Sequence, residues 1–203
     1  MTIIEAIFLG IIQGLTEFLP VSSSGHLVIV QSVLGVVQPG NEFEILVHIG
    51  TLMSVLVVFK NDILEILFDM RSKSTQKYIL YIIIGTVPAV FIGLGYTNFI
   101  ESLFNNLKTV GSALIFTGLV LFGSQFSVKN DLKLSIYTAF LIGCAQAIAI
   151  IPGISRSGMT ISMALVLGFL PKDAARFSFL LAIPVISGAG ILTIIELNED
   201  NYK

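Results

Sequence analysis

The chain is poor in charged residues, and this scarcity already excludes a large class of proteins. Asp, Glu, Lys and Arg make up 12% of the 203 residues, whereas an ordinary soluble domain carries about 25%. Hydrophobic residues account for 55% of the chain, and the mean hydropathy is +0.94. These values exclude a soluble globular protein and predict an all-α membrane protein with several spans.

Basic residues, tryptophan and cysteine are also scarce. Eleven Lys and Arg residues stand against thirteen Asp and Glu residues, so the formal net charge is −2 and no basic field exists to attract nucleic acid. Trp is absent, and the single cysteine, Cys144, can form neither an intrachain disulfide nor a zinc cluster. The stretch Met1 to Glu5 lacks the basic region of a signal peptide, so we expect the first apolar segment to remain in the mature protein.

Eight apolar segments follow one another along the chain. They cover residues 2–19, 24–37, 43–59, 78–97, 109–126, 134–151, 158–170 and 177–197. A helix that crosses the hydrocarbon needs about 20 residues, so 24–37 and 158–170 are short. Each of these two follows a proline, Pro20 or Pro152, and a turn rich in Ser and Gly. We therefore predict re-entrant helical hairpins at 2–37 and 134–170, and full spans in the other four segments.

The basic residues predict how these segments are oriented. One side of the membrane would carry eight of the eleven: Lys60, Arg71, Lys73, Lys77, Lys129, Lys133, Lys172 and Arg176. By the positive-inside rule that side is cytoplasmic, so the first hairpin enters from outside and the second from inside. The stretch 61–71 has apolar residues at helical spacing, and we expect it to lie on the cytoplasmic membrane surface.

The two predicted hairpins share a sequence pattern. Gln13 lies twelve residues before Gly25, Gln146 lies twelve before Gly158, and both stretches pass a proline and end in Ser-x-Ser-Gly. Opposite entry sides make this an inverted repeat within one membrane domain, with 1–127 as the first unit and 128–203 as a shortened second unit. In such folds the two breaks meet near the bilayer midplane, where half-helix N-termini face an anion. An anion site is therefore expected between residues 20–26 and 152–160.

Three polar residues beside the breaks carry the strongest signal. Gln13 and Glu17 are four residues apart and so share one helix face. An ionised Glu at membrane depth costs at least about 2.5 kcal/mol without a partner, and Arg156 is the expected partner. A purely structural ion pair that joins the hairpins is the alternative. Charges inside a membrane are by default functional, which favours a site.

Hydroxyl and imidazole groups surround this pair. Ser155, Arg156, Ser157 and Thr160 open the helix after the second break and would form an oxyanion site suited to phosphate. Serines also cap helices for structural reasons, so both interpretations stay open for Ser22 and Ser155.

The two histidines carry different expectations. His26 follows Ser22, Ser23 and Ser24, and an imidazole can act there as nucleophile, base or acid, a choice that the sequence leaves open. For His48, in the third segment, we expect a packing or interfacial role.

The stretches around both breaks resemble the two signatures of the undecaprenyl-diphosphate phosphatase family associated with bacitracin resistance. They read Gln13-Gly-Leu-Thr-Glu-Phe-Leu-Pro-Val-Ser-Ser-Ser-Gly-His26 and Pro152-Gly-Ile-Ser-Arg-Ser-Gly-Met-Thr160. The first signature begins Glu/Gln-x-x-x-Glu and the second reads Pro-Gly-x-Ser-Arg-Ser-x-x-Thr; the chain satisfies both, with Gln at position 13. The stretches from Phe43 and from Ala174 are similar as well, so the resemblance spans nearly the whole chain.

The resemblance implies a plasma-membrane enzyme that hydrolyses undecaprenyl diphosphate at the outer face and returns the monophosphate carrier lipid to peptidoglycan synthesis. A polyprenyl diphosphate lipid is then its partner and a divalent metal ion, Mg²⁺ or Ca²⁺, its cofactor. Matched position by position, Glu17 and Gln13 fall on the metal and diphosphate positions, and Ser23 and His26 on the nucleophile or base positions. The expected substrate-binding residues are Gln13, Ser22, Ser24, Ser155, Arg156, Ser157 and Thr160, and the expected catalytic residues are Glu17, Ser23, His26 and Arg156.

The second half of the chain departs from the family pattern. Each half of the family's repeat has a hairpin and three further helices, whereas the second half here has one, at 177–197. We therefore expect the last two helices of the family pattern to be missing. Their absence would leave a groove exposed to lipid, which lipid or a second subunit of a homodimer would cover. Two alternatives to a phosphatase stay open: a transporter or flippase built on the same repeat, and an inactive relative that binds the lipid diphosphate.

Overall fold

The computed structural model describes residues 1–36, 42–104, 106–128 and 130–200, and its regular elements are all helices. In chain order these are α1 (Ile3–Glu17), α2 (Ser23–Leu34), α3 (Glu42–Val58), α4 (Lys60–Phe68), α5 (Lys73–Gly95), α6 (Thr97–Phe104), α7 (Leu107–Ser124), α8 (Ile136–Ile148), α9 (Arg156–Val166) and α10 (Pro171–Asp200). The all-α class is therefore confirmed. Most of the loop expected at 38–42, and the basic residues Lys129 and Lys203, lie outside the described residues.

Helix breaks occur at both predicted places. In the first, α1 ends at Glu17 and α2 begins at Ser23 after a turn that contains Pro20. In the second, α8 ends at Ile148 and α9 begins at Arg156 after a turn in which Gly153 has a φ of +95°. Glycine fits this left-handed conformation without strain. The breaks are thus encoded locally, whereas the re-entrant insertion of the hairpins stays a prediction.

Among the described residues, three helices are long and apolar enough to cross a membrane: Lys73–Gly95, Leu107–Ser124 and the first 22 residues of α10, Pro171–Leu192. They correspond to three of the four predicted spans. The fourth, 43–59, forms the 17-residue helix α3, whose apolar stretch Ile45–Val58 is shorter than a full span. The stretch between the predicted spans 78–97 and 109–126 contains most of the short helix α6.

Apolar side chains cover much of the outer surface, as membrane embedding requires. Along α1, one stripe consists of Ile3, Ile7, Ile11 and Leu15, which are 80%, 59%, 55% and 66% exposed. Large apolar residues are exposed on α5 and α7 as well. Surfaces of this extent are rare on soluble monomers and are stable against lipid. The chain is therefore an integral membrane protein.

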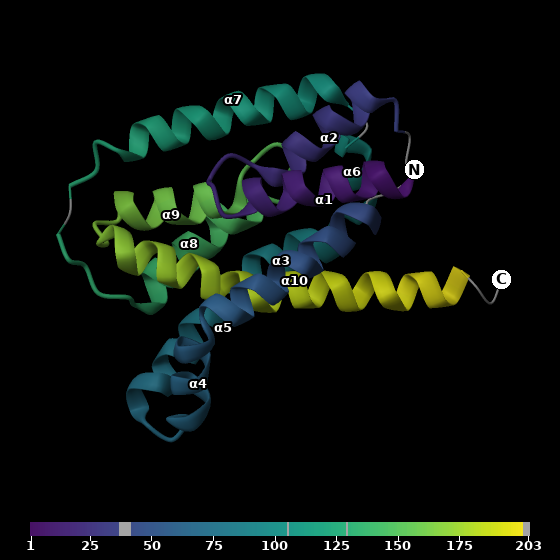
Figure 1. Cartoon of the computed structure of the whole chain (residues 1–203). Coiled ribbons are helices and arrows are strands. Elements are labelled where there is room, and N and C mark those ends of the chain that lie inside the picture. The colour runs from purple at the N-terminus through teal and green to yellow at the C-terminus, as the bar shows by residue number, and fades with distance from the viewer. Residues whose placement is uncertain (37–41, 105, 129, 201–203) are drawn as a thin grey trace.

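The helices pack as pairs around the two breaks. α1 lies against α2 and α8 against α9, while α10 packs on α3, α5 and α9. Figure 1 shows α7 along one edge, beside α2 and α9, and α4 at the far end of α5. The stretch 61–71 was expected to be helical, and α4 occupies most of it. Arg176 of α10 holds α4 through ion pairs with Asp62 and Glu65, at 2.5 Å and 3.5 Å.

The crossing of α5 and α8 depends on two glycines. A Cβ on Gly143 would overlap the backbone of Gly85, including its carbonyl oxygen, so the two helices touch backbone to backbone. Small residues permit this close approach between helices in membranes.

Gly143→Ala is expected to lower the melting temperature of the detergent-solubilised protein, because overpacking of this kind costs about 1–3 kcal/mol. Thermal unfolding of the purified variant measures the effect. Gly14→Ala is the matched control, since a Cβ at that helical position meets no atom within 4 Å. An unchanged melting temperature for Gly143→Ala would contradict the close crossing.

Candidate active site

The two helix breaks lie against each other. A Cβ on Gly25 would lie 2.9 Å from the Gly153 Cα, and one on Gly158 would lie 3.0 Å from the Pro20 carbonyl oxygen. Thr117 of α7 fixes the second break, because its hydroxyl donates to the Gly153 carbonyl at 3.0 Å and accepts from the Ser155 amide at 3.1 Å. This packing brings the serines of both breaks into one region.

Both half-helices begin with a serine cap. The Ser22 hydroxyl accepts from the Gly25 amide at 3.3 Å, and the Ser155 hydroxyl accepts from the Gly158 amide at 3.0 Å. Each cap satisfies one amide of its helix and leaves the N-terminus of α2 or α9 facing the junction. The hydroxyls of Ser22 and Ser155 thus have the structural role that the sequence left open, and both residues also line a cavity.

Glu17 is the centre of the polar contacts at this junction. The residue is 8% exposed, and its Oε1 accepts from Arg156 Nη2 at 2.8 Å. Its Oε2 accepts from the Ser23 hydroxyl at 2.5 Å and from Gln13 Nε2 at 3.1 Å. His48 Nε2 lies 3.3 Å from the same oxygen. The expected pairing of Glu17 with Arg156 is therefore present, within a larger network.

Arg156 is held from its other side by α10. Its Nη1 donates to the Ser178 carbonyl at 3.4 Å, and the hydroxyls of Ser178 and Thr160 lie 2.6 Å apart. Thr160 is fully buried, its hydroxyl donates to the Arg156 carbonyl at 2.8 Å, and it does not line the cavity. The guanidinium is thus fixed between the first hairpin and α10, with its remaining donors available for an anion.

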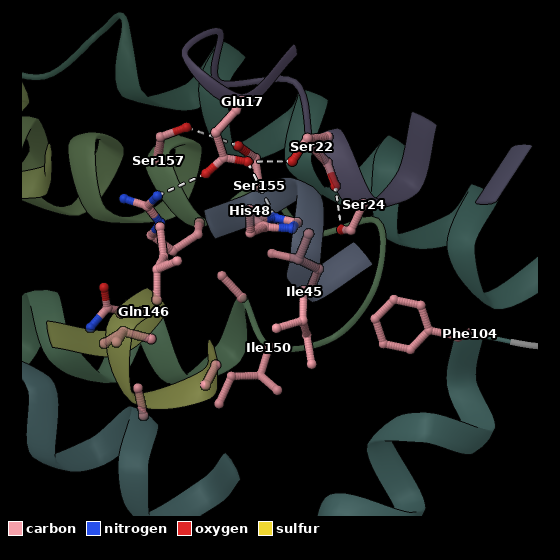
Figure 2. Close-up of a pocket in the computed structure, with 18 residues that line it drawn as sticks. Glu17, Ser22, Ser24, Ile45, His48, Phe104, Gln146, Ile150, Ser155 and Ser157 are labelled. Carbon is pink, nitrogen blue, oxygen red and sulfur yellow. Dashed lines mark hydrogen bonds and ion pairs between the residues drawn. The ribbon is translucent and has the colours of Figure 1, made fainter. Parts of the chain in front are cut away.

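A cavity of about 210 Å³ opens beside this network. Figure 2 shows Glu17, His48 and the serines at its polar end, with Ile45, Ile150 and Phe104 at the other end. Its lining includes Glu17, Ser22, Ser23, Ser24, His48, Ser155, Arg156 and Ser157. Seven of the ten predicted site residues therefore meet at one cavity; the exceptions are Gln13, His26 and Thr160.

The cavity also contains polar residues for which the sequence analysis predicted no site role. His48 was expected to pack, yet it contacts Glu17 and lines the cavity. Gln146, at the repeat position of Gln13, lines the cavity, is 2% exposed, and donates from Nε2 to the Gly85 carbonyl at 3.3 Å. A His side chain within an apolar helix is costly to bury without a polar partner. The position of His48 in such a helix was therefore the sequence signal that it contacts another polar group.

His26 lies away from the cavity. Its Nδ1 is 2.7 Å from the Ser22 carbonyl oxygen one turn earlier, and the side chain does not line the cavity.

The side-chain oxygens of Gln13 and Glu17 could bind one divalent cation if substrate phosphates supplied further ligands. Among the described residues no three His, Cys, Asp or Glu side chains cluster to form a complete metal site. Gln13 Oε1 is buried and has no hydrogen-bond partner within the described part of the chain, and the Glu17 carboxylate is adjacent. Mg²⁺ is commonly bound by one or two carboxylates together with substrate phosphates, so these two residues fit such an ion.

Comparison with known proteins gives a consistent result. The family model for bacitracin resistance protein BacA matches residues 6–202. An undecaprenyl-diphosphatase of Carboxydothermus hydrogenoformans is 46% identical, over 99% of this chain and 77% of the relative. One from Halothermothrix orenii is 44% identical, over 96% and 75%, and one from Korarchaeum cryptofilum is 41% identical, over 96% and 78%.

Proposed function

Because the chain belongs to the family of bacitracin resistance protein BacA, we propose that it is an undecaprenyl-diphosphatase with its active site between the two helix breaks. It hydrolyses undecaprenyl diphosphate to undecaprenyl phosphate and inorganic phosphate, and so recycles the carrier lipid for cell-wall synthesis. The observation that carries this function is the buried Glu17–Arg156 pair beside two half-helix N-termini and a row of hydroxyls. The names of the relatives favour hydrolysis over transport or inactive binding.

Arg156 and the N-termini of α2 and α9 bind the diphosphate. The guanidinium offers paired donors to phosphoryl oxygens, and the N-termini supply positive dipole ends for charge that develops during phosphoryl transfer. Ser22, Ser24, Ser155 and Ser157 line the same cavity and supply hydroxyl donors. Thr160 does not contact the substrate. Its hydroxyl is hydrogen-bonded to that of Ser178, whose carbonyl accepts from Arg156, so Thr160 helps to position the guanidinium.

Ser23 is the proposed nucleophile. Its hydroxyl already donates to Glu17, so the carboxylate can take the proton as Ser23 Oγ attacks the terminal phosphorus. The phosphoanhydride bond breaks and undecaprenyl phosphate leaves. Water then attacks the phosphoserine phosphorus, the bond to Ser23 Oγ breaks, Glu17 returns its proton to Ser23 Oγ, and inorganic phosphate departs with the protons of the water. This geometry favours Glu17 over His26 as the base, because His26 contacts its own helix. Direct attack by water is the alternative.

The divalent metal is proposed to bind at Glu17 and Gln13. Gln13 Oε1, which has no hydrogen-bond partner among the described residues, and the Glu17 carboxylate are hard oxygen donors suited to Mg²⁺ or Ca²⁺. The ion would neutralise charge on the diphosphate oxygens. Gln13 would also orient the Glu17 carboxylate, because its Nε2 donates to Glu17 Oε2 at 3.1 Å.

The membrane placement is also part of the proposal. The contacts between the two breaks and their shared sequence pattern support an inverted repeat with two re-entrant hairpins. The distribution of basic residues supports an active site that opens to the outer face of the plasma membrane. The protein is also proposed to form a homodimer, in which the second subunit covers part of the exposed apolar surface and lipid covers the rest.

Phosphate release from undecaprenyl diphosphate by the detergent-purified protein tests the activity and its metal dependence. We expect release in the presence of Mg²⁺ or Ca²⁺, loss of release with EDTA, and recovery when the ion is restored. No release from protein that elutes as a single folded species would contradict the function. Release that EDTA leaves unchanged would contradict the metal.

A further inference from the structure

The cavity has two chemically different walls. One carries the charged and hydroxyl groups described above. The other is apolar and is built from four separate parts of the chain: Ile45 of α3, Phe104 of α6, Ile150 after α8, and Val185 with Ile186 on α10. In Figure 2 the Phe104 ring and the Ile45 and Ile150 side chains lie on the side away from Glu17.

The sequence repeat shows where this asymmetry arises. Gln13 and Glu17 are four residues apart in the first unit, and Gln146 and Ile150 occupy the same spacing in the second. An isoleucine therefore stands at the repeat position of the central carboxylate. Its Cδ1 lies 3.9 Å from the place of a Cβ on Gly93, so it packs towards α5 while it lines the cavity. The second break thus supplies an apolar group where the first supplies the acid.

The cavity volume limits what this wall can contact. At about 210 Å³ it is smaller than the roughly 300–1,000 Å³ of pockets that enclose drug-sized ligands. A diphosphate at the polar end leaves room for only the nearest part of a lipid chain. The remainder of such a chain must continue outside the cavity.

Building on the proposed function, we propose that the apolar wall binds the isoprene units next to the diphosphate, with Ile150 and Phe104 as specificity-determining residues. The phosphates lie against Arg156, and the first carbons of the chain pass between Ile150 and Phe104. The wall thereby selects prenyl diphosphates over diphosphates that lack a hydrocarbon chain. The distal chain contributes through lipid and not through this wall.

The test compares the KM of the Ile150→Asn variant for three substrates of decreasing chain length: undecaprenyl diphosphate, farnesyl diphosphate and methyl diphosphate. A polar group opposite the first isoprene units is expected to raise KM about tenfold for both prenyl substrates, a penalty of the size that a hydrophobic pocket imposes. KM for methyl diphosphate is expected to stay unchanged. Phe104→Ala is expected to show the same pattern and provides a second variant if Ile150→Asn folds poorly.

Ile148→Asn is the matched control, because Ile148 is 46% exposed and does not line the cavity. Equal KM changes for all three substrates, or none for any, would overturn the assignment of the wall. An effect confined to undecaprenyl diphosphate would show a role in binding the distal chain or bulk lipid and would also overturn it. Failure of the proposed function is distinct, since the wild-type protein would then release no phosphate from any of the three.

Discussion

Arg156→Ala is expected to reduce phosphate release from undecaprenyl diphosphate by about 10³-fold while the protein stays folded. The guanidinium is the cation proposed to bind the transferred phosphoryl group, and its side chain is 16% exposed. The fold survives because Glu17 keeps its contacts with Gln13, Ser23 and His48. Initial rates at saturating substrate, together with the elution volume in detergent, measure both parts of the expectation.

Arg176→Ala is the matched control for this experiment. Arg176 also forms ion pairs, with Asp62 and Glu65, but it does not line the cavity. Its loss is expected to leave turnover close to that of the wild type. Normal turnover by a well-folded Arg156→Ala variant would remove the guanidinium from the mechanism.

Glu17→Gln is expected to cost both activity and stability. The amide keeps the size of the side chain but removes the charge, so the nearly buried Arg156 loses its counter-ion and Ser23 loses its proton acceptor. Breaking a buried pair from one side destabilises by about 3 kcal/mol, and turnover is expected to fall by about 10²- to 10³-fold. Thermal unfolding and phosphate release, measured on the same preparation, separate the two effects.

Glu5→Gln controls for the chemical change on the same helix. Glu5 belongs to the capping box at the start of α1, where glutamine can replace it. Both its activity and its melting temperature are expected to match the wild type. A Glu17→Gln variant that behaves like Glu5→Gln would show that the carboxylate has neither role.

The breaks and the central ion pair could be predicted because their causes are local or electrostatic. Pro20 and Pro152 each stand in a turn rich in Ser and Gly, a combination that ends a helix, and the serines there cap the helix that follows. The pairing of Glu17 with Arg156 followed from the cost of isolated charge in a membrane. These features needed no knowledge of how distant helices pack.

The rest of the site depends on packing between distant segments. His48 reaches Glu17 only because α3 packs on α1 and α10, and Gln146 faces the cavity because α8 crosses α5 at Gly85. His26 was expected at the site because three serines precede it. The His26 ring instead contacts the carbonyl oxygen of Ser22, one helical turn earlier. Residues that are close in sequence therefore do not all point into the cavity. The fourth predicted span, 43–59, agrees within one residue with α3, because a continuous apolar stretch sets the bounds of that helix locally.

The most direct test of the central claim is a double-mutant cycle on phosphate release from undecaprenyl diphosphate, with the conservative substitutions Glu17→Gln and Arg156→Lys. If the two hairpins form one catalytic unit, the activity of the double variant is expected to be only slightly below that of the less active single variant. Losses that multiply would show that Glu17 and Arg156 act independently, and would contradict a single active site at the junction of the two breaks.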